Sequence, residues 1–348
     1  MERCRAPWPG AVAVSGGGDS LALMHLLKAW AKERRLPAPV VLTVDHGLHR
    51  ESGATARKVL RWADAAGLRA HLLRWKEPRP TSDVEAAARE ARYRLMGEWC
   101  RRHGIATLYA GHTLDDQAET FLLRLARGSG LDGLSAMRAV NAYPVADYQE
   151  LRLVRPLLGF ERRALREYLI AIAQSWVEDP MNEEPRFSRV RIRRLMGELQ
   201  AAGLTAARIA DAASHLGRAR DALDEATAAV LKRACIAHEG TVLVEAAALL
   251  AAPREVGLRA LSRVLMGVSG QVYRPRFERL ERLFDTIAAG TLGAGRTLHG
   301  CRIAPAPGSR ARFGPGTLAI ARERPRAGGE GGQRRGKRVN SGRRARSP

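Results

Sequence analysis

Six consecutive residues near the start of the chain have the composition of a phosphate-binding loop: Ser15, Gly16, Gly17, Gly18, Asp19 and Ser20. The residue pattern predicts a strand at 11–14 directly before them and a helix at 19–34 directly after. Three glycines let the backbone turn tightly and leave N–H groups uncovered at a helix N-terminus, where an anion is stabilised. The hydroxyls of Ser15 and Ser20 can donate hydrogen bonds to the same phosphates. A structural alternative stays open, in which this is a glycine-rich turn and Asp19 or Ser20 caps the helix.

Two carboxylates, Asp116 and Glu119, lie three residues apart in a predicted helix at 114–127. This spacing puts both on one face near the start of the helix, where a cationic amine or a metal ion could sit between them. Thr113 and Asp116 also satisfy the pattern of a capping box, so a purely structural role of Asp116 stays open. Glu119 has no such capping role.

Two arginines and a strand end supply further candidates. Arg89 and Arg92 are three residues apart in a predicted helix at 84–99 and flank its apolar stripe, beside the edge of the sheet where ligands bind. A solvated charged face explains that spacing equally well. Asp45 and His46 follow the second predicted strand, although a histidine taken alone is more often a surface or packing residue.

Two other phosphate-binding motifs fail the test of context. A Walker A loop needs Gly-Lys followed by Ser or Thr, and Gly-Lys occurs only at Gly336–Lys337, before an arginine. The dinucleotide pattern G-x-G-x-x-G occurs at 128–133, but it follows a predicted helix rather than a strand. The sequence therefore supports neither a P-loop NTPase nor a Rossmann oxidoreductase, and it predicts a flexible loop at 128–133.

The elements that must position these residues alternate between strand and helix over the first 175 residues. The predicted strands are 11–14, 40–44, 70–74, 107–110 and 151–154. The predicted helices are 19–34, 54–66, 84–99, 114–127 and 161–174. Such alternation is typical of parallel βαβ units, so the predicted fold class is α/β with a doubly wound parallel sheet.

After residue 200 the pattern changes to one long helix. Large apolar residues recur seven apart at Ile209, Leu216, Leu223 and Val230. Small residues follow the first three of them at a distance of three, at Ala212, Ala219 and Ala226. This seam predicts a helix packed closely against a neighbour through its alanines.

The chain has 348 residues and a formal net charge of +22, from 58 Lys and Arg residues against 36 Asp and Glu. Residues 322–348 carry ten basic and two acidic residues, so the other residues keep a charge of +14. Such a charge favours a polyanionic partner such as nucleic acid, because each neutralised phosphate releases counterions. Only six of the cations are lysine, so a compositional bias towards arginine contributes as well.

Several classes of protein are disfavoured by the sequence. No apolar stretch approaches the ~18 residues that a membrane span needs. Glu2, Pro7 and Pro9 interrupt any secretory h-region. The four cysteines, at positions 4, 100, 235 and 301, form neither a C-x-x-C pair nor a zinc pattern. We therefore expect a cytoplasmic protein without a membrane association, a disulfide scaffold or a cysteine-bound metal.

The glycine-rich loop resembles that of the PP-loop ATP pyrophosphatases, which have the adenine nucleotide alpha hydrolase-like fold. Further motifs resemble the tRNA(Ile)-lysidine synthetases of that superfamily, and they cover about residues 10–195 in the right order. These motifs stand at 44–48, 88–93, 111–121, 125–134, 155–158 and 176–182. One departure is Ser188, where many relatives have Asn before the arginines of 189–193.

The resemblance implies that free lysine is joined to C2 of the wobble cytidine (C34) in the CAU anticodon of tRNA(Ile). ATP is gripped by its β- and γ-phosphates, and Mg²⁺ accompanies it. The O2 atom of the base attacks the α-phosphate to form an adenylated cytidine, and the ε-amine of lysine then displaces AMP. The products are lysidine, AMP and pyrophosphate, and the tRNA changes its codon from AUG to AUA and its identity from Met to Ile.

The same resemblance implies the roles of individual residues. Catalysis is assigned to Asp19, Arg89, Arg92, Asp116 and Glu119. Nucleotide binding is assigned to Ser15, Gly16, Gly17, Gly18, Asp19, Ser20, Asp45, His46 and Gly111. Binding of lysine or tRNA is assigned to Asp116, Glu119, Arg189, Arg191 and Arg193, and binding of Mg²⁺ to Asp19 and Glu119.

Four segments are expected on this basis. They are a PP-loop ATP-binding catalytic domain at 1–200, a long helical linker at 201–238, a small α+β tRNA-binding domain at 239–321 and a disordered basic tail at 322–348. The oligomeric state stays open, with a homodimer as one option. Three other functions stay open as well: a PP-loop enzyme that thiolates tRNA, a PP-loop enzyme that amidates a small metabolite, and an RNA-binding protein without activity.

Overall fold

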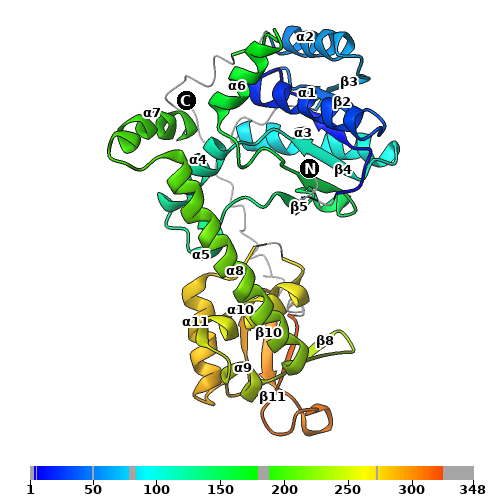
Figure 1. Ribbon diagram of the computed structural model, residues 1–348. Helices are drawn as coiled ribbons and strands as arrows, with labels where there is room; N and C mark the ends of the chain where they lie inside the picture. The colour runs from blue at the N-terminus through cyan, green and yellow to red at the C-terminus, as the bar shows by residue number, and fades with distance from the viewer. Residues whose placement is uncertain are drawn as a thin grey trace, which may run out of the picture. The chain divides into compact units, whose positions relative to one another are not determined.

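The structure is a computed structural model that describes residues 4, 6–48, 51–77, 84–178, 188–271 and 273–323 (Figure 1). The chain divides into two compact units, Met1–Asp221 and Ala222–Pro348. This boundary falls inside one helix, α8 (Ala206–Ala234). The division into four segments at 200, 238 and 321 remains a prediction, and the expected disordered tail lies outside the described residues from residue 324 onwards.

The first unit is built on a six-stranded sheet with the order β3-β2-β1-β4-β6-β5. Its strands are β1 (Ala11–Ala13), β2 (Val40–Asp45), β3 (Ala70–Arg74), β4 (Thr107–Ala110), β5 (Val140–Ala142) and β6 (Arg152–Val154). All neighbouring pairs are parallel except β5 and β6, which run antiparallel with Val140 opposite Val154. The predicted doubly wound parallel sheet is therefore confirmed, and the antiparallel edge strand β5, which has three residues, was not among the predicted strands.

Helices cover both faces of this sheet, as a doubly wound fold requires. Helices α1 (Gly18–Glu33), α2 (Ser52–Ala65) and α6 (Arg162–Ala171) share one buried cluster, whereas α3 (Val84–Arg102) shares the opposite one with Leu42 and Leu108. The same unit also contains α4 (Leu114–Leu125), which packs against α5 (Leu131–Leu134) and α7 (Ser188–Ala201). The predicted helix at 161–174 ends early, at Ala171, because Ala173 has a left-handed backbone.

Strand β1 lies between β2 and β4, so the chain leaves it towards one side and later returns on the other. In an open parallel sheet, a ligand binds at the carboxyl ends of the strands at such a reversal of strand order. The segments that follow β1, β4 and β6 therefore meet at one edge. The pattern at 128–133 lies elsewhere: it forms a turn and α5 rather than the flexible loop that was predicted.

Helix α8 confirms the long predicted helix but not its seam. Ala212, Ala219 and Ala226 are exposed, and the buried small residues are instead Ala213 and Thr227. In an α-helix of 3.6 residues per turn, positions three and four after a buried residue both lie near its face. A seven-residue repeat drifts slowly around the helix axis, and in α8 it is the fourth position, not the third, that stays on the buried face. The alanine seam was therefore wrong by one residue.

The second unit contains a five-stranded antiparallel sheet with the order β7-β8-β11-β10-β9. Its elements are β7 (Cys235–His238), β8 (Thr241–Glu245), α9 (Ala246–Leu250), α10 (Arg254–Ser269), α11 (Phe277–Ala288), β9 (Arg296–Leu298), β10 (Cys301–Pro305) and β11 (Thr317–Arg322). Strand β7 falls inside the segment expected to be a helical linker. Within the part of the chain that the structure describes, we find no helix long and apolar enough to cross a membrane.

Candidate active site

The glycine-rich loop joins β1 to α1, at the edge where ligands of such sheets bind. The hydroxyl of Ser20 accepts a hydrogen bond from the Ser15 amide at 3.2 Å and donates one to the Gly17 carbonyl at 2.9 Å. Gly17 is the N-cap residue of α1 and no side chain caps the helix, so neither Asp19 nor Ser20 has the capping role considered above. The first turn of α1 therefore keeps uncapped N–H groups, which favour an anion.

A second segment, 176–178, packs against this loop. The Val177 amide donates to the Gly16 carbonyl at 2.9 Å, and a Cβ on Gly18 would lie 3.7 Å from the Trp176 indole. Gly16 has a φ of +98°, and a Cβ there would meet Thr55 at 2.9 Å, so a side chain at this position would disturb the loop. Trp176 is held in turn by a hydrogen bond that its indole N–H donates to Glu178 at 2.8 Å. The rest of this motif, 179–182, lies outside the described residues.

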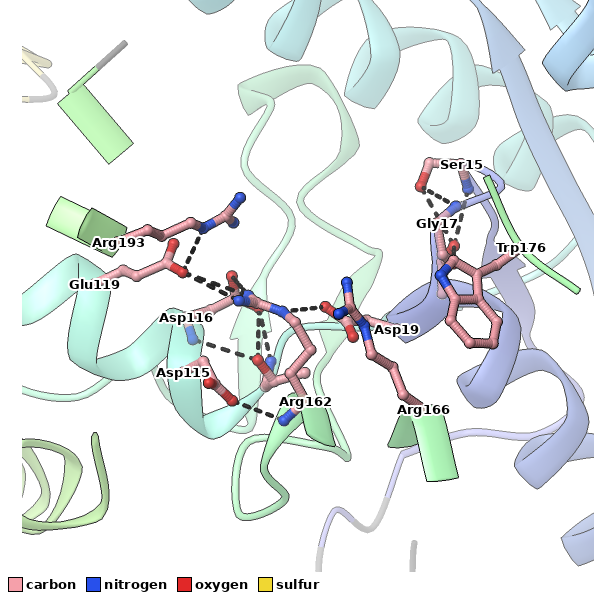
Figure 2. Close-up of polar contacts among 12 residues, drawn as sticks. Ser15, Gly17, Asp19, Asp115, Asp116, Glu119, Arg162, Arg166, Trp176 and Arg193 are labelled. Carbon is pink, nitrogen blue, oxygen red and sulfur yellow. Dashed lines mark hydrogen bonds and ion pairs between the residues drawn. The ribbon is translucent and has the colours of Figure 1, made fainter. Parts of the chain in front are cut away.

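Beside the loop, Arg162 connects three carboxylates that come from two different helices. Its guanidinium bonds Asp19 at 3.1 Å, Asp116 at 3.3 Å and Glu119 at 3.3 Å (Figure 2). Its backbone N–H, at the start of α6, donates to Asp115 at 2.7 Å. Arg162 thus joins the first turn of α1 to the first turns of α4, and the candidate carboxylates Asp19, Asp116 and Glu119 are brought together around it.

The electrostatics of this cluster follow from its burial. Desolvation raises the pKa of Asp19, although the neighbouring Arg162 partly opposes the shift. For Arg162 burial works against the charge, but the carboxylates of Asp116, Asp19 and Glu119 outweigh it, so the pKa of the guanidinium is raised above its ordinary value. An Arg at this position is therefore permanently charged, and it stabilises the ionised form of the carboxylates around it.

Asp116 has both roles that its sequence position allowed. Its Oδ2 accepts a hydrogen bond from the Thr113 amide at 2.8 Å, while its own amide donates to the Thr113 hydroxyl at 3.3 Å. These two bonds complete the capping box of α4. Its other oxygen, Oδ1, faces Arg162. One carboxylate therefore starts the helix and also contributes to the cluster.

Glu119 is the most deeply buried member, with a side chain that is 3% exposed. Its Oε1 accepts hydrogen bonds from Arg162 and from Arg193 of α7, the latter at 2.7 Å (Figure 2). Its Oε2 is also buried and has no hydrogen-bond partner among the described residues. Burying a carboxylate oxygen without a partner is costly, so this atom marks a position where a donor or cation would be stabilised.

A second polar group, next to the cluster, is dominated by arginines. The pKa of His112 is lowered to about 4, chiefly by burial and then by the charge of Arg155, with smaller contributions from Arg89 and Arg189. The His112 imidazole is therefore neutral near pH 7, and its Nδ1 has no partner among the described residues. His112 follows β4 and Arg155 follows β6, so the sheet itself brings these two side chains to the edge where the loop lies.

Arg89 and Arg92 lie on α3 and stack over Tyr93, with guanidinium carbons 5.2 Å and 5.9 Å from the ring centre. Burial lowers the pKa of Arg92, and the nearby positive charges of Arg89 and Arg189 add to that effect. A group of like charges that repel one another is stabilised when an anion binds. The solvated-face alternative fits exposed Arg89 better than Arg92, which is half-buried.

Two other candidates, Asp45 and His46, have contacts within their own turn. Asp45 accepts a hydrogen bond from Ser52 at 2.6 Å, which is the main cause of its lowered pKa, and another from the Gly47 amide. The His46 ring accepts from the Leu48 amide at 3.3 Å. These bonds fix the turn between β2 and α2, so a nucleotide role of Asp45 and His46 is still a prediction.

Gly111 contributes through close packing. A Cβ there would lie 2.8 Å from the Asp19 carbonyl oxygen and 3.0 Å from the Ser20 Cα. Only glycine allows the end of β4 to approach the glycine-rich loop this closely. Within α7, Ser188 accepts a hydrogen bond from Arg191, whereas Arg189 is exposed and influences His112 and Arg92 by its charge.

Arg162 already occupies one oxygen of each carboxylate in the cluster, which limits how a metal ion could bind there. Over the described ranges, no group of three or more His, Cys, Asp or Glu side chains is arranged to hold a metal. Mg²⁺ commonly binds one or two carboxylates and completes its shell with phosphate oxygens and water. Asp19 and Glu119 each use one oxygen on Arg162, so the second oxygen of each fits a magnesium ion that also binds phosphates.

Two residues of the site were missed from the sequence, Arg162 and His112. Arg162 is separated from Asp19 by 143 residues, so no local spacing reveals their contact. The available signal was its position shortly after the Arg155–Leu158 motif. His112 stood inside a quoted motif, and its burial at a strand end gives it its unusual pKa.

Comparisons with known proteins agree with this geometry. A family model described as a PP-loop domain matches residues 9–199. The tRNA(Ile)-lysidine synthase of Methylobacterium nodulans is 41% identical over 91% of this chain and 91% of that protein. The one of Anaplasma marginale is 36% identical over 90% of this chain, which spans only 65% of that relative's length. Among solved structures, the U34-tRNA thiolase NcsA from Methanococcus maripaludis matches 62% of this chain with a TM-score of 0.47 and 15% identity.

Proposed function

The chain belongs to the tRNA(Ile)-lysidine synthase family of PP-loop ATP-dependent enzymes, and on that premise we propose that it ligates free L-lysine to C2 of the wobble cytidine of tRNA(Ile) with a CAU anticodon. ATP supplies the energy and is converted to AMP and pyrophosphate. The reaction has two steps, adenylation of the cytidine O2 and displacement of AMP by the lysine ε-amine.

The excess of carboxylates over guanidinium groups around Glu119 is the observation that supports this proposal most strongly. Three carboxylates, Asp19, Asp116 and Glu119, face two guanidinium groups, those of Arg162 and Arg193. Among these five side chains the carboxylates outnumber the guanidinium groups, and the buried Oε2 of Glu119 has no hydrogen-bond partner in the described part of the chain. An ammonium group supplies one positive charge and up to three hydrogen-bond donors. The protonated amine of a lysine substrate would therefore compensate the excess of carboxylates and donate a hydrogen bond to this oxygen.

The adenylation step needs a cradle for the leaving pyrophosphate and cations near the α-phosphate. Uncapped amides of the loop and the hydroxyls of Ser15 and Ser20 suit the β- and γ-phosphates. Arg92 and Arg155, whose pKa values are lowered by burial, suit the negative charge that builds up at phosphorus. We assign Mg²⁺, which would neutralise phosphate charge, to Asp19 and Glu119 in this step, and the lysine amine to Glu119 in the step that follows, because the Oε2 of Glu119 cannot hold both cations at once.

The displacement step needs an uncharged amine held in line with the C2 carbon of the cytidine. Glu119 and Asp116 would bind and orient the lysine, and removal of its proton precedes attack. His112 is neutral at pH 7, because its pKa is lowered to about 4, so it offers a hydrogen bond in the pocket without adding charge. Arg89, Arg189 and Arg191 remain for phosphates of the anticodon stem, whereas Arg193 is bonded to Glu119.

A thiolation reaction fits the cysteines poorly. Burial raises the pKa of the Cys100 thiol to about 12 and that of Cys235 to about 11, so both stay protonated at neutral pH. A thiolate is the reactive form in sulfur transfer and in cluster binding. All four cysteines are free, which suits a reducing cytoplasm, where we expect the enzyme to act.

Incorporation of labelled lysine into tRNA transcripts tests the function. We expect incorporation that requires ATP and a CAU anticodon on a tRNA(Ile) body, and none into the same body with a different base at position 34. Glu119→Gln should reduce incorporation by at least a hundredfold. Glu167→Gln, at an exposed residue of α6 that pairs with Arg163 among the described residues, should not change it. Equal lysine incorporation by the wild type and Glu119→Gln would overturn the assignment of the lysine site.

A further inference from the structure

Segment 174–178, which packs against the glycine-rich loop, is bound to helix α6 by an ion pair and an aromatic contact. The Oε1 atom of Glu178 accepts a hydrogen bond from the Trp176 indole and another from Arg166 of α6, each at 2.8 Å. The Arg166 guanidinium also lies over the indole, 6.0 Å from the ring centre. Arg166, Trp176 and Glu178 thus form one connected group, the brace, that fixes the end of the segment to the helix.

The start of the segment is anchored as well. The side-chain oxygen of Gln174 lies 3.0 Å from Nε2 of His25 in α1, and the Gln174 amide donates to the Leu169 carbonyl of α6 at 2.9 Å. Ala173, with a φ of +52°, has the left-handed backbone that commonly ends a helix. Contacts with α1 and α6 therefore hold the segment at both of its ends.

Between these anchors, one backbone hydrogen bond joins the segment to the loop: the Val177 amide donates to the Gly16 carbonyl at 2.9 Å. In a planar trans peptide, the C=O of one residue and the N–H of the next point in opposite directions. The N–H of Gly17 is therefore directed away from the segment, and its nitrogen lies 3.4 Å from the Ser15 hydroxyl oxygen (Figure 2). The hydroxyls of Ser15 and Ser20, which suit phosphate oxygens, are themselves 3.3 Å apart. The segment thus aims the Gly17 N–H at the side of the loop where the two hydroxyls lie.

The two glycines offer little resistance to rotation of this peptide. Gly16 and Gly17 have no Cβ, so the peptide between them can rotate at little steric cost. A reversed peptide would present the Gly16 carbonyl oxygen, rather than the Gly17 N–H, to a bound phosphate. Because an anion is stabilised by N–H groups and not by carbonyl oxygens, the bond from Val177 favours the orientation that binds phosphate.

We propose that Arg166 and Glu178 are positioning residues for ATP. They act through Trp176 and Val177, which hold the peptide between the two glycines with its N–H towards the phosphates. The proposal rests on the proposed function for the identity of the nucleotide. Neither charged side chain has to touch ATP, so we expect an effect on ATP binding rather than on transfer of the adenylyl group.

Glu178→Ala and Arg166→Gln test the brace in the full-length protein. Each removes a contact that holds the segment, and we expect the KM for ATP to rise roughly tenfold, as for one weakened hydrogen bond to a charged group. The kcat and the KM for lysine should stay unchanged, because Glu119 of the lysine site is held by Arg162 and Arg193 rather than by the brace. Glu178→Gln keeps a side-chain oxygen that can accept from the indole, so it should restore part of the ATP affinity.

The ion pair of Arg163 and Glu167 is the matched control. Its atoms are also 2.8 Å apart, but it joins two exposed residues of the same helix. Glu167→Ala should therefore leave the KM for ATP at the wild-type value. The Arg166 and Glu178 side chains are 44% and 64% exposed, and an exposed ion pair contributes little to global stability. All of these variants should melt at nearly the wild-type temperature, so that a raised KM for ATP cannot be ascribed to unfolding.

Hydrogen exchange and a double variant test the route of the effect. The Val177 amide should exchange faster in Glu178→Ala than in the wild type, since its bond to Gly16 opens more often. Combining Arg166→Gln with Glu178→Ala should raise the KM for ATP no further than Glu178→Ala alone, because both changes break one connected contact. Unchanged exchange of the amide, or additive effects of the two substitutions, would contradict this route.

The outcomes separate the two proposals. If the wild type incorporates lysine but Glu178→Ala and Glu167→Ala have the same KM for ATP, the brace does not position the loop, and the proposed function stands. An equal rise of the KM values for ATP and lysine would also overturn the positioning role, because it would show a general disturbance of the site. If the wild type binds ATP without incorporating lysine, the proposed function fails, and ATP affinities from calorimetry still test the brace.

Discussion

At the residue scale, Arg162 controls the charge of the candidate site, because it is the common partner of Asp19, Asp116 and Glu119. Removing the cation leaves three carboxylates close together in a partly buried place. Loss of one partner from a buried ion pair costs about 3–5 kcal/mol of stability when the remaining charges stay uncompensated. The same loss changes the protonation of the carboxylates, and that change can be measured.

We predict that Arg162→Gln shifts the acid limb of the pH–rate profile to higher pH. Desolvation already raises the pKa of Asp19 and Arg162 opposes it, so without Arg162 the carboxylate takes up its proton at a higher pH. Lysine incorporation, measured from pH 5 to 9, should therefore begin to fall at a higher pH as the medium is acidified. Arg162→Lys should restore part of the wild-type profile.

The neighbouring Arg163 gives a matched control, because its side chain is 86% exposed and, among the described residues, its ion pair is with Glu167 on its own helix. Arg163→Gln should keep both the rate and the pH profile of the wild type. An Arg162→Gln enzyme with an unshifted acid limb would show that Arg162 does not set the ionisation of Asp19.

His112 predicts a pH dependence of stability. Its pKa is lowered from 6.5 to about 4 in the folded protein, so between these values the unfolded chain binds more protons than the folded one. Stability is therefore present above pH 6.5 and is lost as the pH falls towards 4, by about 3 kcal/mol in total.

Replacing His112 removes this pH-dependent contribution to the free energy of unfolding. We expect urea unfolding of His112→Gln to lose about 3 kcal/mol less than the wild type between pH 6.5 and pH 4. His71→Gln is the comparison, because its ring is far less buried and its pKa is lowered less by the same cause. Parallel stability curves for His112→Gln and the wild type would contradict the burial of a neutral imidazole.

Site residues that belong to a short sequence motif could be predicted from the sequence. Site residues whose role depends on contacts with distant parts of the chain could not. The glycine-rich loop and the pair Asp116 and Glu119 follow from short-range spacing, and the structure brings Asp19 to the same cluster. Arg162 was missed because its partners lie 43 to 143 residues away. The nucleotide, lysine and metal roles themselves remain predictions that mutagenesis must test.

At the scale of elements, the site depends on the close approach of β4 to the start of α1. Gly111 permits it, since a Cβ at that position would meet Asp19 and Ser20 backbone atoms at 2.8–3.0 Å. Backbone atoms cannot move aside as the end of a flexible side chain does. An added methyl group must therefore displace the glycine-rich loop or the end of the strand.

We predict that Gly111→Ala destabilises the protein by about 1–3 kcal/mol and raises the KM for ATP by at least tenfold. Gly197→Ala is the control, because Gly197 is exposed in the middle of α7 and a Cβ there meets nothing within 4 Å. That substitution should stabilise the helix by up to about 1 kcal/mol. Thermal unfolding and ATP-dependent activity measure both, and wild-type ATP affinity in Gly111→Ala would refute the close-packing role.

Elements that follow a clear turn signal were predictable, whereas others were not. The strands at 70–74 and 107–110 match β3 and β4, because each is an apolar run that follows shortly after a glycine, Gly67 or Gly104. Strand β5 has three residues and pairs antiparallel with β6 through a local connection, so its pattern is too short to detect. Helix α7 was also missed, because its arginines were interpreted as a binding motif rather than as a helix face.

At the scale of the whole molecule, the chain combines two compact units with a strong positive charge. The family model matches residues 9–199, which lie in the first unit. The elements of the second unit were predicted from the sequence in less detail. A mixed small domain could be expected from its pattern, but its antiparallel strand order could not, because strand pairing depends on contacts between distant segments.

The most direct test uses ATP labelled at the α-phosphate, with tRNA(Ile) carrying a CAU anticodon and no lysine. We predict that labelled AMP becomes attached to the tRNA, and that adding lysine releases it as free AMP in equal amount to the lysine incorporated. Label that never reaches the tRNA, or that leaves ATP as ADP, would contradict a site that exposes the α-phosphate to attack.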